Sequence, residues 1–435
     1  MLKESPWARN SEATGGGLQR QGGGAADDHW REKELSLEQV LAKYPDISPF
    51  VIVKIDVQRR GVAYTQAALD KVDPDLHITK IRSDYCEKDD LAPASLMLRD
   101  GTTIFTEGSM VDRYRAPYVV DVVDGRVVLM DEGRVIEEVE YWEKPDYYDK
   151  TTSRGIPMWQ VVSARPQRLT IHPNQFCDFW KKKGSGCKFC AIAATYKSTD
   201  KQSLLDVDDI VETVAEAIRE PGRNVNIFLT GGTLLGGVEV LEEELDLYMK
   251  ILSGITSLFD GRKFPSQLIG TAFSKDQLQR LCDQTGLMTY TADIEVLNKE
   301  LFEWICPGKA AVFGYEGWKE RLYRAVDVFG PGNVNTGIVG GVELARPKGF
   351  ASEEEAVAAD VAEAEVLAAH GISVVSCVWR VLKGSIFHRQ KTPSLEYYAL
   401  LAKGLDGVRR AYGISVDMDD YRRCGNHADT DLGRI

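Results

Sequence analysis

The chain has 435 residues, of which 43% are hydrophobic and 27% charged, and its formal net charge is −13. This is the composition of a globular protein with enough chain for a large core. The acidic balance weighs against a nucleic acid as the main partner, because phosphate binding requires a basic surface. No apolar run approaches the ~18 residues of a membrane span and no signal-peptide h-region begins the chain, so we expect a cytoplasmic protein without a membrane partner.

The first 158 residues divide into an arm and a small domain. Residues 1–33 are rich in glycine, polar and charged types, and we expect a disordered arm there. Residues 34–158 predict an N-terminal, mostly-β accessory domain of α+β content, whose favoured role is to cover one end of the next domain rather than to close over substrate or dimerise. Ser36 is the expected N-cap of its one short helix. Strands are expected in V-I-V-K-I-D-V, L-M-L-R-D, Y-V-V-D-V-V-D-G-R-V-V-L-M and R-V-I-E-E-V-E-Y, mostly antiparallel, with a hairpin turn at D-G.

Strands and helices alternate over residues 159–390, as is typical of βα units around a parallel sheet. Six such units indicate an α/β fold, a partial (β/α)6 TIM-type barrel, whose reactive end is the C-terminal edge of the strands. Residues 391–435 predict a last helix and a tail that cover the barrel. The six expected strands are R-L-T-I-H-P (168–173), N-V-N-I-F-L-T (224–230), Q-L-I-G-T-A-F (267–273), M-T-Y-T-A-D-I-E-V (288–296), N-V-N-T-G-I-V-G-G-V-E (333–343) and I-S-V-V-S-C-V-W-R-V-L (372–382).

Three of the eight cysteines lie in one loop after the first barrel strand, as Cys177, Cys187 and Cys190 with the spacing C-x9-C-x2-C. Thiolates are suited to iron–sulfur clusters and to zinc. Gly184 and Gly186 allow the loop to fold back, so that Cys177 joins the other two. Three thiolates on a cubane leave one iron without a protein ligand, whereas a structural metal site is normally closed by four ligands.

Other arrangements of this loop stay open. His172, five residues before Cys177, would complete a Cys3His zinc site. A disulfide with one free thiol is disfavoured, because there is no secretion signal and intracellular thiols stay reduced. No second closely spaced cluster motif is predicted, since the other cysteines are scattered: Cys86, Cys282, Cys306, Cys377 and Cys424.

The loop resembles the cluster-binding loop of the radical S-adenosylmethionine (SAM) superfamily. Its commonest form is C-x3-C-x2-C with an aromatic residue before the last cysteine, where Phe189 stands here. The first gap of nine marks a variant, similar to the long gap in the Elongator catalytic subunit family, although the acidic charge weighs against a tRNA-modifying role. The resemblance implies a [4Fe–4S] cluster on Cys177, Cys187 and Cys190, with SAM chelating the open iron through its amino and carboxylate groups.

T-G-G-T (230–233) directly follows the second strand. Glycines let the backbone approach a ligand closely, although a plain tight turn gives the same pattern. In the superfamily this position carries G-G-E or a variant that binds the amino group of SAM. The resemblance therefore implies cofactor contacts from Gly231 and Gly232, with Thr233 in place of the acid.

A-D-I-E-V (292–296) ends the fourth strand. Carboxylates at i and i+2 share one face of a strand, here the expected barrel interior, where an unpaired charge is costly; a solvent-facing pair is the alternative. Resemblance to the biotin-synthase-like branch implies that Asp293 and Glu295 hold the ribose hydroxyls or the amino group of SAM. The following I-C-P-G-K (305–309) also resembles that branch, with Cys306 expected as packing.

T-G-I-V-G-G-V-E (336–343), on the fifth strand, resembles the superfamily pattern G-x-I-x-G-x-x-E. Ile338, Gly340 and Glu343 match, and Thr336 replaces the first glycine. In the superfamily the isoleucine packs on the adenine of SAM and the other residues shape the strand end, so the resemblance implies that all three belong to the cofactor site.

In the tail, Cys424 and His427 lie three residues apart. Cys424 is interpreted as a catalytic hydrogen donor to a substrate radical; a metal pair and a plain turn are the alternatives.

The resemblance covers residues 160–390 and implies a function. One electron into the cluster would cleave SAM reductively to a 5′-deoxyadenosyl radical, which abstracts hydrogen from a small-molecule substrate. Reduced flavodoxin or ferredoxin is the expected electron donor. The alternatives are aminocarboxypropyl transfer from SAM and a non-catalytic iron–sulfur or zinc protein that binds a partner.

Overall fold

Six parallel strands form the main sheet, and their order along it follows the sequence from β8 to β13. The computed structural model describes residues 34–79, 91–106, 115–192, 204–414 and 425–434, and Leu35–Ile435 forms one compact unit. The strands are β8 Arg168–Ile171, β9 Asn226–Thr230, β10 Ser266–Ile269, β11 Thr289–Thr291, β12 Val334–Gly340 and β13 Ile372–Val378. The predicted partial (β/α)6 barrel is confirmed.

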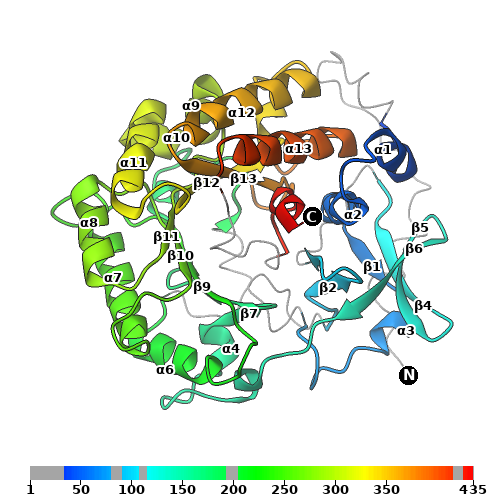
Figure 1. Cartoon of the computed structure of the whole chain (residues 1–435), viewed down its shortest axis with the longest axis horizontal. Helices are drawn as coiled ribbons and strands as arrows, with labels where there is room; N and C mark the ends of the chain where they lie inside the picture. Colours follow the sequence, from blue (N-terminus) through cyan, green and yellow to red (C-terminus); the bar gives the residue numbers. More distant parts are fainter. Residues whose placement is uncertain (1–33, 80–90, 107–114, 193–203, 415–424, 435) are drawn as a thin grey trace. The chain divides into compact units, whose positions relative to one another are not determined.

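Helices follow the outer side of these strands (Figure 1). They are α6 Val207–Ala217, α7 Glu242–Ser257, α8 Lys275–Gln284, α9 Lys299–Ile305, α10 Pro307–Val312, α11 Gly314–Phe329, α12 Glu353–Ala368 and α13 Leu395–Ala411. Capping side chains explain several of their starts, since an oxygen at the N-cap accepts an otherwise unpaired backbone N–H. Ser274 forms a capping box with Gln277 at the start of α8, and Asn298, Ser352 and Ser394 cap α9, α12 and α13.

The two faces of the barrel strands differ in polarity. Leu169, Leu229 and Leu268 have no exposed surface and face the helices. Arg168 alternates with Leu169 and donates to Asn226 Oδ1 at 3.2 Å on β9 and to Gln267 Oε1 at 2.6 Å on β10, the next two strands along the sheet. The interior is therefore polar here, unlike the branched apolar layers that fill most closed TIM barrels.

The barrel strands are mostly shorter than predicted, and two differences bear on the site. β7 Ser163–Arg165, which was not predicted, pairs antiparallel with β8 at the edge of the sheet. β11 ends at Thr291 instead of Val296, and Glu295 has a left-handed φ of 72°. Because a left-handed residue cannot continue a strand, the prediction that Asp293 and Glu295 share the face of a regular strand was wrong.

A second sheet of six strands precedes the barrel, in the order β1-β4-β5-β6-β2-β3. Within the described ranges only β1 and β4 pair in parallel. Asp124 and Gly125, with φ of 50° and 80°, form the turn between β4 and β5. The mostly antiparallel sheet and its hairpin are thus confirmed. The strands are β1 Val62–Tyr64, β2 Ser95–Leu98, β3 Thr103–Phe105, β4 Tyr118–Val123, β5 Arg126–Asp131 and β6 Arg134–Tyr141.

The predicted helix at the start of this part is confirmed as α1 Leu37–Lys43, capped by Ser36. Two shorter helices, α3 Gln66–Leu69 and α4 Met158–Val161, were not predicted.

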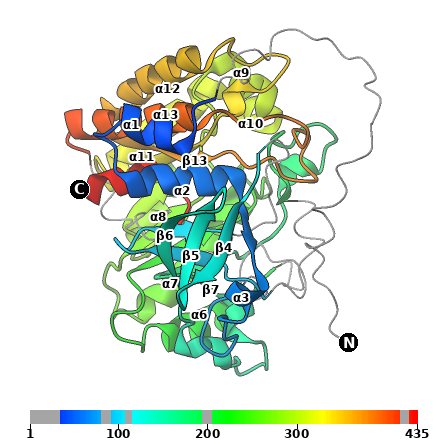
Figure 2. The ribbon, with the colours of Figure 1, turned by 90° about the vertical axis from the view of Figure 1, so that its right-hand side faces the viewer.

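The expected strand V-I-V-K-I-D-V was wrong, because the structure has a helix there, α2 Pro49–Arg60. Proline suits the first turn of a helix, and every residue of Val51–Arg59 is buried. A helix that is buried all round shows no amphipathic stripe, so its β-branched residues imitate a strand pattern. Packing against α13 decides the outcome (Figure 2).

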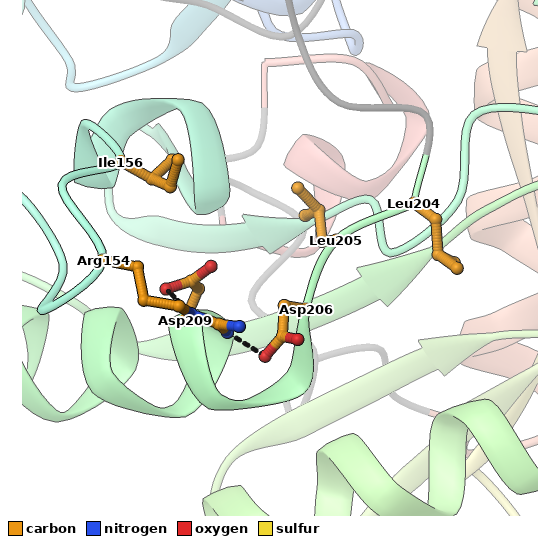
Figure 3. A pocket seen from close by; sticks show the side chains of 6 residues that line it. All are labelled: Arg154, Ile156, Leu204, Leu205, Asp206 and Asp209. Carbon is orange, nitrogen blue, oxygen red and sulfur yellow. Dashed lines mark hydrogen bonds and ion pairs between the residues drawn. The ribbon is translucent and has the colours of Figure 1, made fainter.

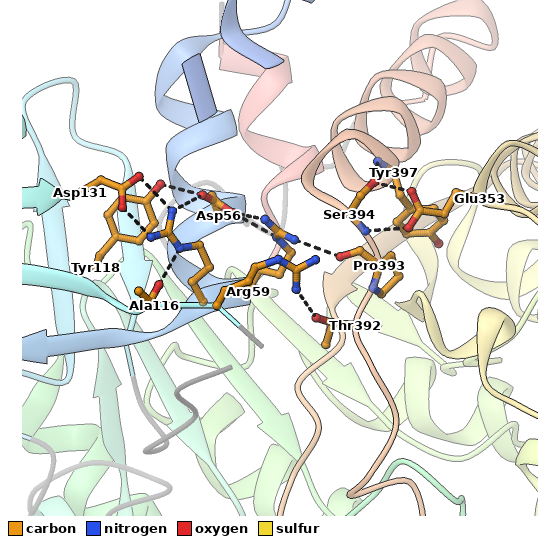
Figure 4. A network of polar contacts seen from close by, with 12 residues as sticks. Asp56, Arg59, Ala116, Tyr118, Asp131, Glu353, Thr392, Pro393, Ser394 and Tyr397 are labelled. Atoms are coloured by element: carbon orange, nitrogen blue, oxygen red, sulfur yellow. Dashed lines mark hydrogen bonds and ion pairs between the residues drawn. The ribbon is translucent and has the colours of Figure 1, made fainter. Parts of the chain in front are cut away.

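Buried polar contacts tie α2 to the barrel (Figure 4). Asp56 accepts from Arg59 Nη2 at 2.5 Å and from the Tyr118 hydroxyl at 2.7 Å. Arg59 also donates to the Pro393 carbonyl at 3.2 Å, just before α13. One helix therefore joins the first sheet to the last barrel helix.

The last described residues pack against α2 and α13. The 3-10 helix η8 Asp429–Arg434 carries two buried carboxylates. Asp431 lies 2.7 Å from Lys54 of α2, and neither side chain is exposed. Asp429 pairs with Arg409 of α13 at 2.8 Å. The described end of the tail is thus fixed to α2 and α13 by buried ion pairs.

Phe105 on β3 lies near both edges of the barrel sheet. The guanidinium carbon of Arg165, on the edge strand β7, is 4.8 Å from the ring centroid. That of Arg380, just beyond the other edge strand β13, is 6.0 Å away. Phe105 N also donates to the Gly425 carbonyl at 3.1 Å. β3 therefore lies across the gap of the open barrel, which favours the covering role for the first sheet.

The longest described helix, α13, has 17 residues. In the described part of the chain, no helix combines the length and the apolar character that crossing a membrane requires.

Candidate active site

The cysteine loop follows β8 at the C-terminal edge of the sheet. After Cys177 the chain forms the 3-10 helix η4 Asp178–Trp180. A Cβ at Gly186 would lie 2.4 Å from the Trp180 ring. The return of the loop toward its first cysteine therefore requires a glycine, in agreement with the sequence argument.

The cysteine thiols of the loop are buried or partly buried. Burial raises the pKa of Cys190 to about 12, and the other two cysteines add to it. Burial also raises the pKa of Cys177, against the effect of the Phe179 and Thr233 N–H groups that donate to its sulfur. Ile192 N donates to Cys190 Sγ at 3.5 Å. Such N–H groups stabilise thiolates, the form that binds metal. Because burial keeps these thiols protonated, loading a metal here must release protons.

The T-G-G-T turn after β9 packs directly on this loop. A Cβ at Gly231 would lie 1.9 Å from Asn174 Oδ1, and one at Gly232 would lie 2.0 Å from the Phe176 carbonyl oxygen. Asn174 Nδ2 donates to the Gly232 carbonyl at 2.8 Å. Both glycines are required by this close approach, which brings two of the predicted motifs together.

A third segment, residues 305–309, supports the loop from the other side. Lys188 N donates to the Ile305 carbonyl at 2.9 Å, and Gly308 N donates to the Ser185 carbonyl at 2.9 Å. A hydrogen bond with Cys306, together with burial, raises the pKa of Cys187 well above its usual value. Cys306 was expected as packing; the structure adds that it contacts a predicted cluster ligand.

Lys309 joins this segment to the end of β11. Its Nζ donates to Glu295 Oε1 at 2.8 Å and to the Asp293 carbonyl at 2.5 Å. Burial raises the pKa of Glu295 to about 7, and Lys309 opposes that rise. Asp293 Oδ1 accepts from Gly337 N at 2.7 Å. Both predicted carboxylates therefore lie between β12 and the segment that supports the cysteine loop, and Lys309 is a site residue that the sequence reasoning missed.

The residues of the β12 motif divide between two places. Ile338 forms a bridge with Glu295 and is 3% exposed. Gly340 faces α13, since a Cβ there would lie 2.8 Å from Leu401. Glu343 is buried and accepts from the Tyr397 hydroxyl of α13. A cofactor contact remains a prediction for all three, and the positions of Gly340 and Glu343 favour a supporting role.

Glu244 of α7 is another residue that the sequence reasoning missed. It accepts from Leu234 N at 2.9 Å and from Thr271 N at 2.8 Å, and burial raises its pKa to about 7. Thr271 in turn lies 2.7 Å from Thr233 through their hydroxyl oxygens. This carboxylate thus fixes the chain just after the T-G-G-T turn.

Of the two tail residues, Cys424 lies outside the described residues, and its predicted role stays a prediction. His427 is partly exposed, and its carbonyl accepts from the Thr430 hydroxyl at 2.9 Å. Phe189 is partly buried and packs against the core beside the last cysteine.

A cavity of about 350 Å³ lies elsewhere, at the start of α6 (Figure 3). Its lining includes Arg154, whose guanidinium lies 3.2 Å from Asp209 Oδ1 and also pairs with Asp206. The charged groups of the cavity thus satisfy one another, and none of them belongs to a predicted motif.

Across the described residues, no group of three or more His, Cys, Asp or Glu side chains is arranged to hold a single metal ion. In a cubane each thiolate binds a different iron, so the three sulfurs need not converge on one point.

No family model matches the chain. It is 23% identical over 199 residues to the bacteriochlorophyllide c C-7(1)-hydroxylase of Chlorobaculum limnaeum, a match that covers 43% of this chain. The chain spans about half the length of that curated relative, 49%.

Three solved structures resemble the chain. Methylornithine synthase has 11% identity and a TM-score of 0.39 and covers 57% of this chain and 69% of its own. A radical SAM methyltransferase from Sphaerobacter thermophilus has 16% identity, a TM-score of 0.38 and coverages of 91% and 98%. The cobalamin-dependent S-adenosylmethionine radical enzyme OxsB has 13% identity and a TM-score of 0.33, and the match covers 73% of this chain and 48% of that one. At these scores the assignment of the fold rests on the strand order and register described above.

Proposed function

We propose that the chain is a radical SAM enzyme that binds a [4Fe–4S] cluster through Cys177, Cys187 and Cys190 and acts on a small-molecule substrate. The observation that carries the proposal is the docking of the cysteine loop on T-G-G-T. Two glycines there approach the loop so closely that no Cβ fits. A plain turn would not require this contact between two motifs that lie far apart in the sequence.

The donor set of the loop fits a cluster. Backbone N–H groups of Phe179, Thr233 and Ile192 point at two of the sulfurs, and such hydrogen bonds tune iron–sulfur sites. When bound, the cluster and SAM together supply a carbon radical, and that chemistry belongs to the cofactors. The chain's own part is to ligate, to orient and to exclude water.

The carboxylates after β11 are proposed to orient SAM. Asp293 and Glu295 are partly exposed, and Lys309 fixes the second of them. We propose that Asp293 receives the ribose hydroxyls or the amino group, because only one of its oxygens is engaged by Gly337 N.

An electron donor is proposed to dock on the cysteine loop. Lys181, Lys182 and Lys183 are exposed there, although the whole chain has a net charge of −13. Lys181 pairs with Asp178 at 2.7 Å. Flavodoxins and ferredoxins are acidic proteins, so a local basic stretch beside the cluster ligands suits reduced flavodoxin or ferredoxin as the donor.

The relatives suggest a range of reactions rather than one. The hydroxylase is named for its action on bacteriochlorophyllide c, and one of the structures is a methyltransferase. We propose for this chain the common step alone, hydrogen abstraction from a small molecule, without the pigment as its substrate.

The decisive experiment is anaerobic reconstitution with iron and sulfide, followed by addition of SAM and dithionite. About four irons per chain and formation of 5′-deoxyadenosine are expected. Methylthioadenosine instead would indicate aminocarboxypropyl transfer. Stoichiometric zinc without iron, or no nucleoside product at all, would leave a metal-binding protein without this catalysis.

A further inference from the structure

Cys377 on β13 faces the barrel interior. Gly340 of β12 faces α13, since a Cβ there would lie 2.8 Å from Leu401. Val339 precedes Gly340 and points to the opposite face. Cys377 is paired in parallel register with Val339, and residues paired in this way share a face. The thiol therefore points inward, and its residue is partly exposed.

The proposed cofactor residues share this face. A Cβ at Gly337, two residues before Val339, would lie 2.5 Å from Asp293 Oδ1. Val339 N donates to the Glu295 carbonyl at 3.1 Å. The Glu295 carboxylate raises the pKa of Cys377 and also that of two cysteines of the cluster loop. One carboxylate thus lies within electrostatic reach of the loop and of Cys377.

Buried polar groups deeper on the same face have no hydrogen-bond partner. Ser373, four residues before Cys377 on β13, is 1% exposed, and its Oγ is unpaired. Asn226 Nδ2 and Thr170 Oγ1 are also unpaired, on residues that are 2% and 1% exposed. Leaving such a group unsatisfied costs about 1–3 kcal/mol. These groups point to a polar molecule bound in the barrel interior, below Cys377.

We propose that Cys377 is the hydrogen-atom donor of this site, an inference that rests on the proposed function. An S–H bond is weaker than a C–H bond, so a carbon radical in the interior can take the thiol hydrogen. A C–H bond forms, the S–H bond breaks, and a thiyl radical remains on Cys377. One electron from the low-potential donor that also serves the cluster, with one proton from water, restores the thiol.

The surroundings keep Cys377 in the form that this role needs. Burial, with a contribution from Glu295, raises its pKa to about 12. The sulfur therefore retains its hydrogen at neutral pH instead of forming a thiolate. Other described cysteines are less suitable: Cys306 has no exposed surface and is engaged with Cys187, and Cys282 lies on α8, among the outer helices.

Isotope transfer tests the proposal without a known substrate. The reconstituted protein is mixed with SAM and dithionite in D2O, with no added thiol, and the 5′-deoxyadenosine is analysed by mass spectrometry. Thiol hydrogens exchange with solvent, so most of the product from the wild type should carry at least one deuterium. Cys377→Ser keeps the shape but offers an O–H bond too strong for a carbon radical, and its product should return to natural abundance. Cys282→Ser is the matched control and should behave as the wild type.

The outcomes distinguish a failure of the role of Cys377 from a failure of the proposed function. Undeuterated 5′-deoxyadenosine from the wild type, or equal deuteration from Cys377→Ser, overturns the role of Cys377 and leaves the proposed function standing. Absence of 5′-deoxyadenosine from the wild type overturns the proposed function, and the role of Cys377 with it.

A second readout does not depend on turnover. Alkylation of Cys377 by iodoacetamide is followed by peptide mass spectrometry in the cluster-loaded protein, with and without S-adenosylhomocysteine. The nucleoside should slow the alkylation of Cys377 and leave that of Cys282 unchanged. Equal protection of both thiols, or of neither, would place Cys377 away from the SAM site and overturn the proposal.

Discussion

Lys309 Nζ lies 2.8 Å from Glu295 Oε1, and Lys309 belongs to the segment that supports the cysteine loop. The ammonium also donates to the Asp293 carbonyl at 2.5 Å and lies 4.5 Å from the Trp318 ring centroid. Burial alone would lower the pKa of Lys309, but Glu295 together with Cys187 and Cys306 outweighs that effect and raises the pKa. The positive charge is therefore fixed, and it holds the left-handed turn at Glu295 in place.

Replacing this cation should destabilise the fold. Lys309→Met leaves Glu295 without its partner, and breaking a buried pair in this way costs about 3–5 kcal/mol. The double variant Lys309→Met/Glu295→Gln should recover a large part, because no uncompensated charge remains. Urea unfolding at pH 8 measures both. A double variant as unstable as the single one would contradict the assigned pairing.

The glycine contact under the cluster loop predicts a sharp effect of one methyl group. In Gly232→Ala the new Cβ would lie 2.0 Å from the Phe176 carbonyl oxygen. Overpacking of this kind costs about 1–3 kcal/mol, and the displaced loop should hold less iron after reconstitution. Gly407→Ala on α13 is the control, since nothing lies within 4 Å of its Cβ. Equal iron contents in both variants would contradict the docking.

The cluster ligands can be tested one by one. Ala in place of Cys177, Cys187 or Cys190 removes one thiolate, so the brown colour and the reducible iron signal of the reconstituted protein should be lost. Cys282→Ala should keep both. Full iron in any of the three loop variants would remove that cysteine from the ligand set.

Two buried carboxylates predict a pH dependence of stability. Burial raises the pKa of Glu343 to about 7, and burial and Glu343 raise that of Asp360 well above its usual value. Between about pH 4.5 and 7 the folded chain keeps a proton that the unfolded chain releases. Folding stability must therefore fall as pH rises through this window, by on the order of 3 kcal/mol for Glu343 at 1.36 kcal/mol per unit.

Asp360→Asn should make that fall smaller, because Asp360 Oδ2 has no partner and its charge adds to that of Glu343. Urea midpoints at pH 5 and pH 8 measure the difference. The exposed Asp283→Asn is the control and should leave it unchanged. If the stability of Asp360→Asn fell as steeply with pH as that of the wild type, Asp360 and Glu343 would not be electrostatically coupled.

The exposed lysines of the cysteine loop predict a selective loss of electron transfer. Lys182→Glu with Lys183→Glu reverses the local charge, so reduction of the cluster by flavodoxin should slow and lose its salt dependence. Reduction by dithionite should not change. Lys263→Glu is the control, because this exposed lysine precedes the N-terminal end of β10, whereas the cysteine loop follows the C-terminal end of β8. If reduction by flavodoxin and reduction by dithionite slowed equally, damage to the cluster would be indicated instead.

Local signals made much of the fold predictable. Ser36 with Gln39 forms the capping box that starts α1, and the D-G pair forms the expected turn. These features depend on neighbours in the sequence. α2 was missed because its burial on all sides comes from partners such as Asp431, 377 residues away from Lys54, and no local periodicity reports such partners.

The site was predictable as a set of motifs but not as a set of contacts. Cysteine spacing and paired glycines indicated the loop and the T-G-G-T turn, which the structure brings together. The left-handed φ of Glu295 and its ion pair with Lys309 were not visible, since a strand pattern continues through the residue. The inward direction of Cys377 follows only from the register of β12 and β13.

The pairing of Lys54 with Asp431 also limits when α2 can dock during synthesis of the chain. α2 leaves the ribosome early, but the carboxylate that neutralises its lysine is translated 377 residues later. At the usual 5–20 residues per second, the delay is roughly 20 to 75 s. During that time Lys54 cannot be buried without cost, and neither can the apolar residues around it. α2 must therefore stay undocked, or be shielded by a chaperone, until η8 emerges.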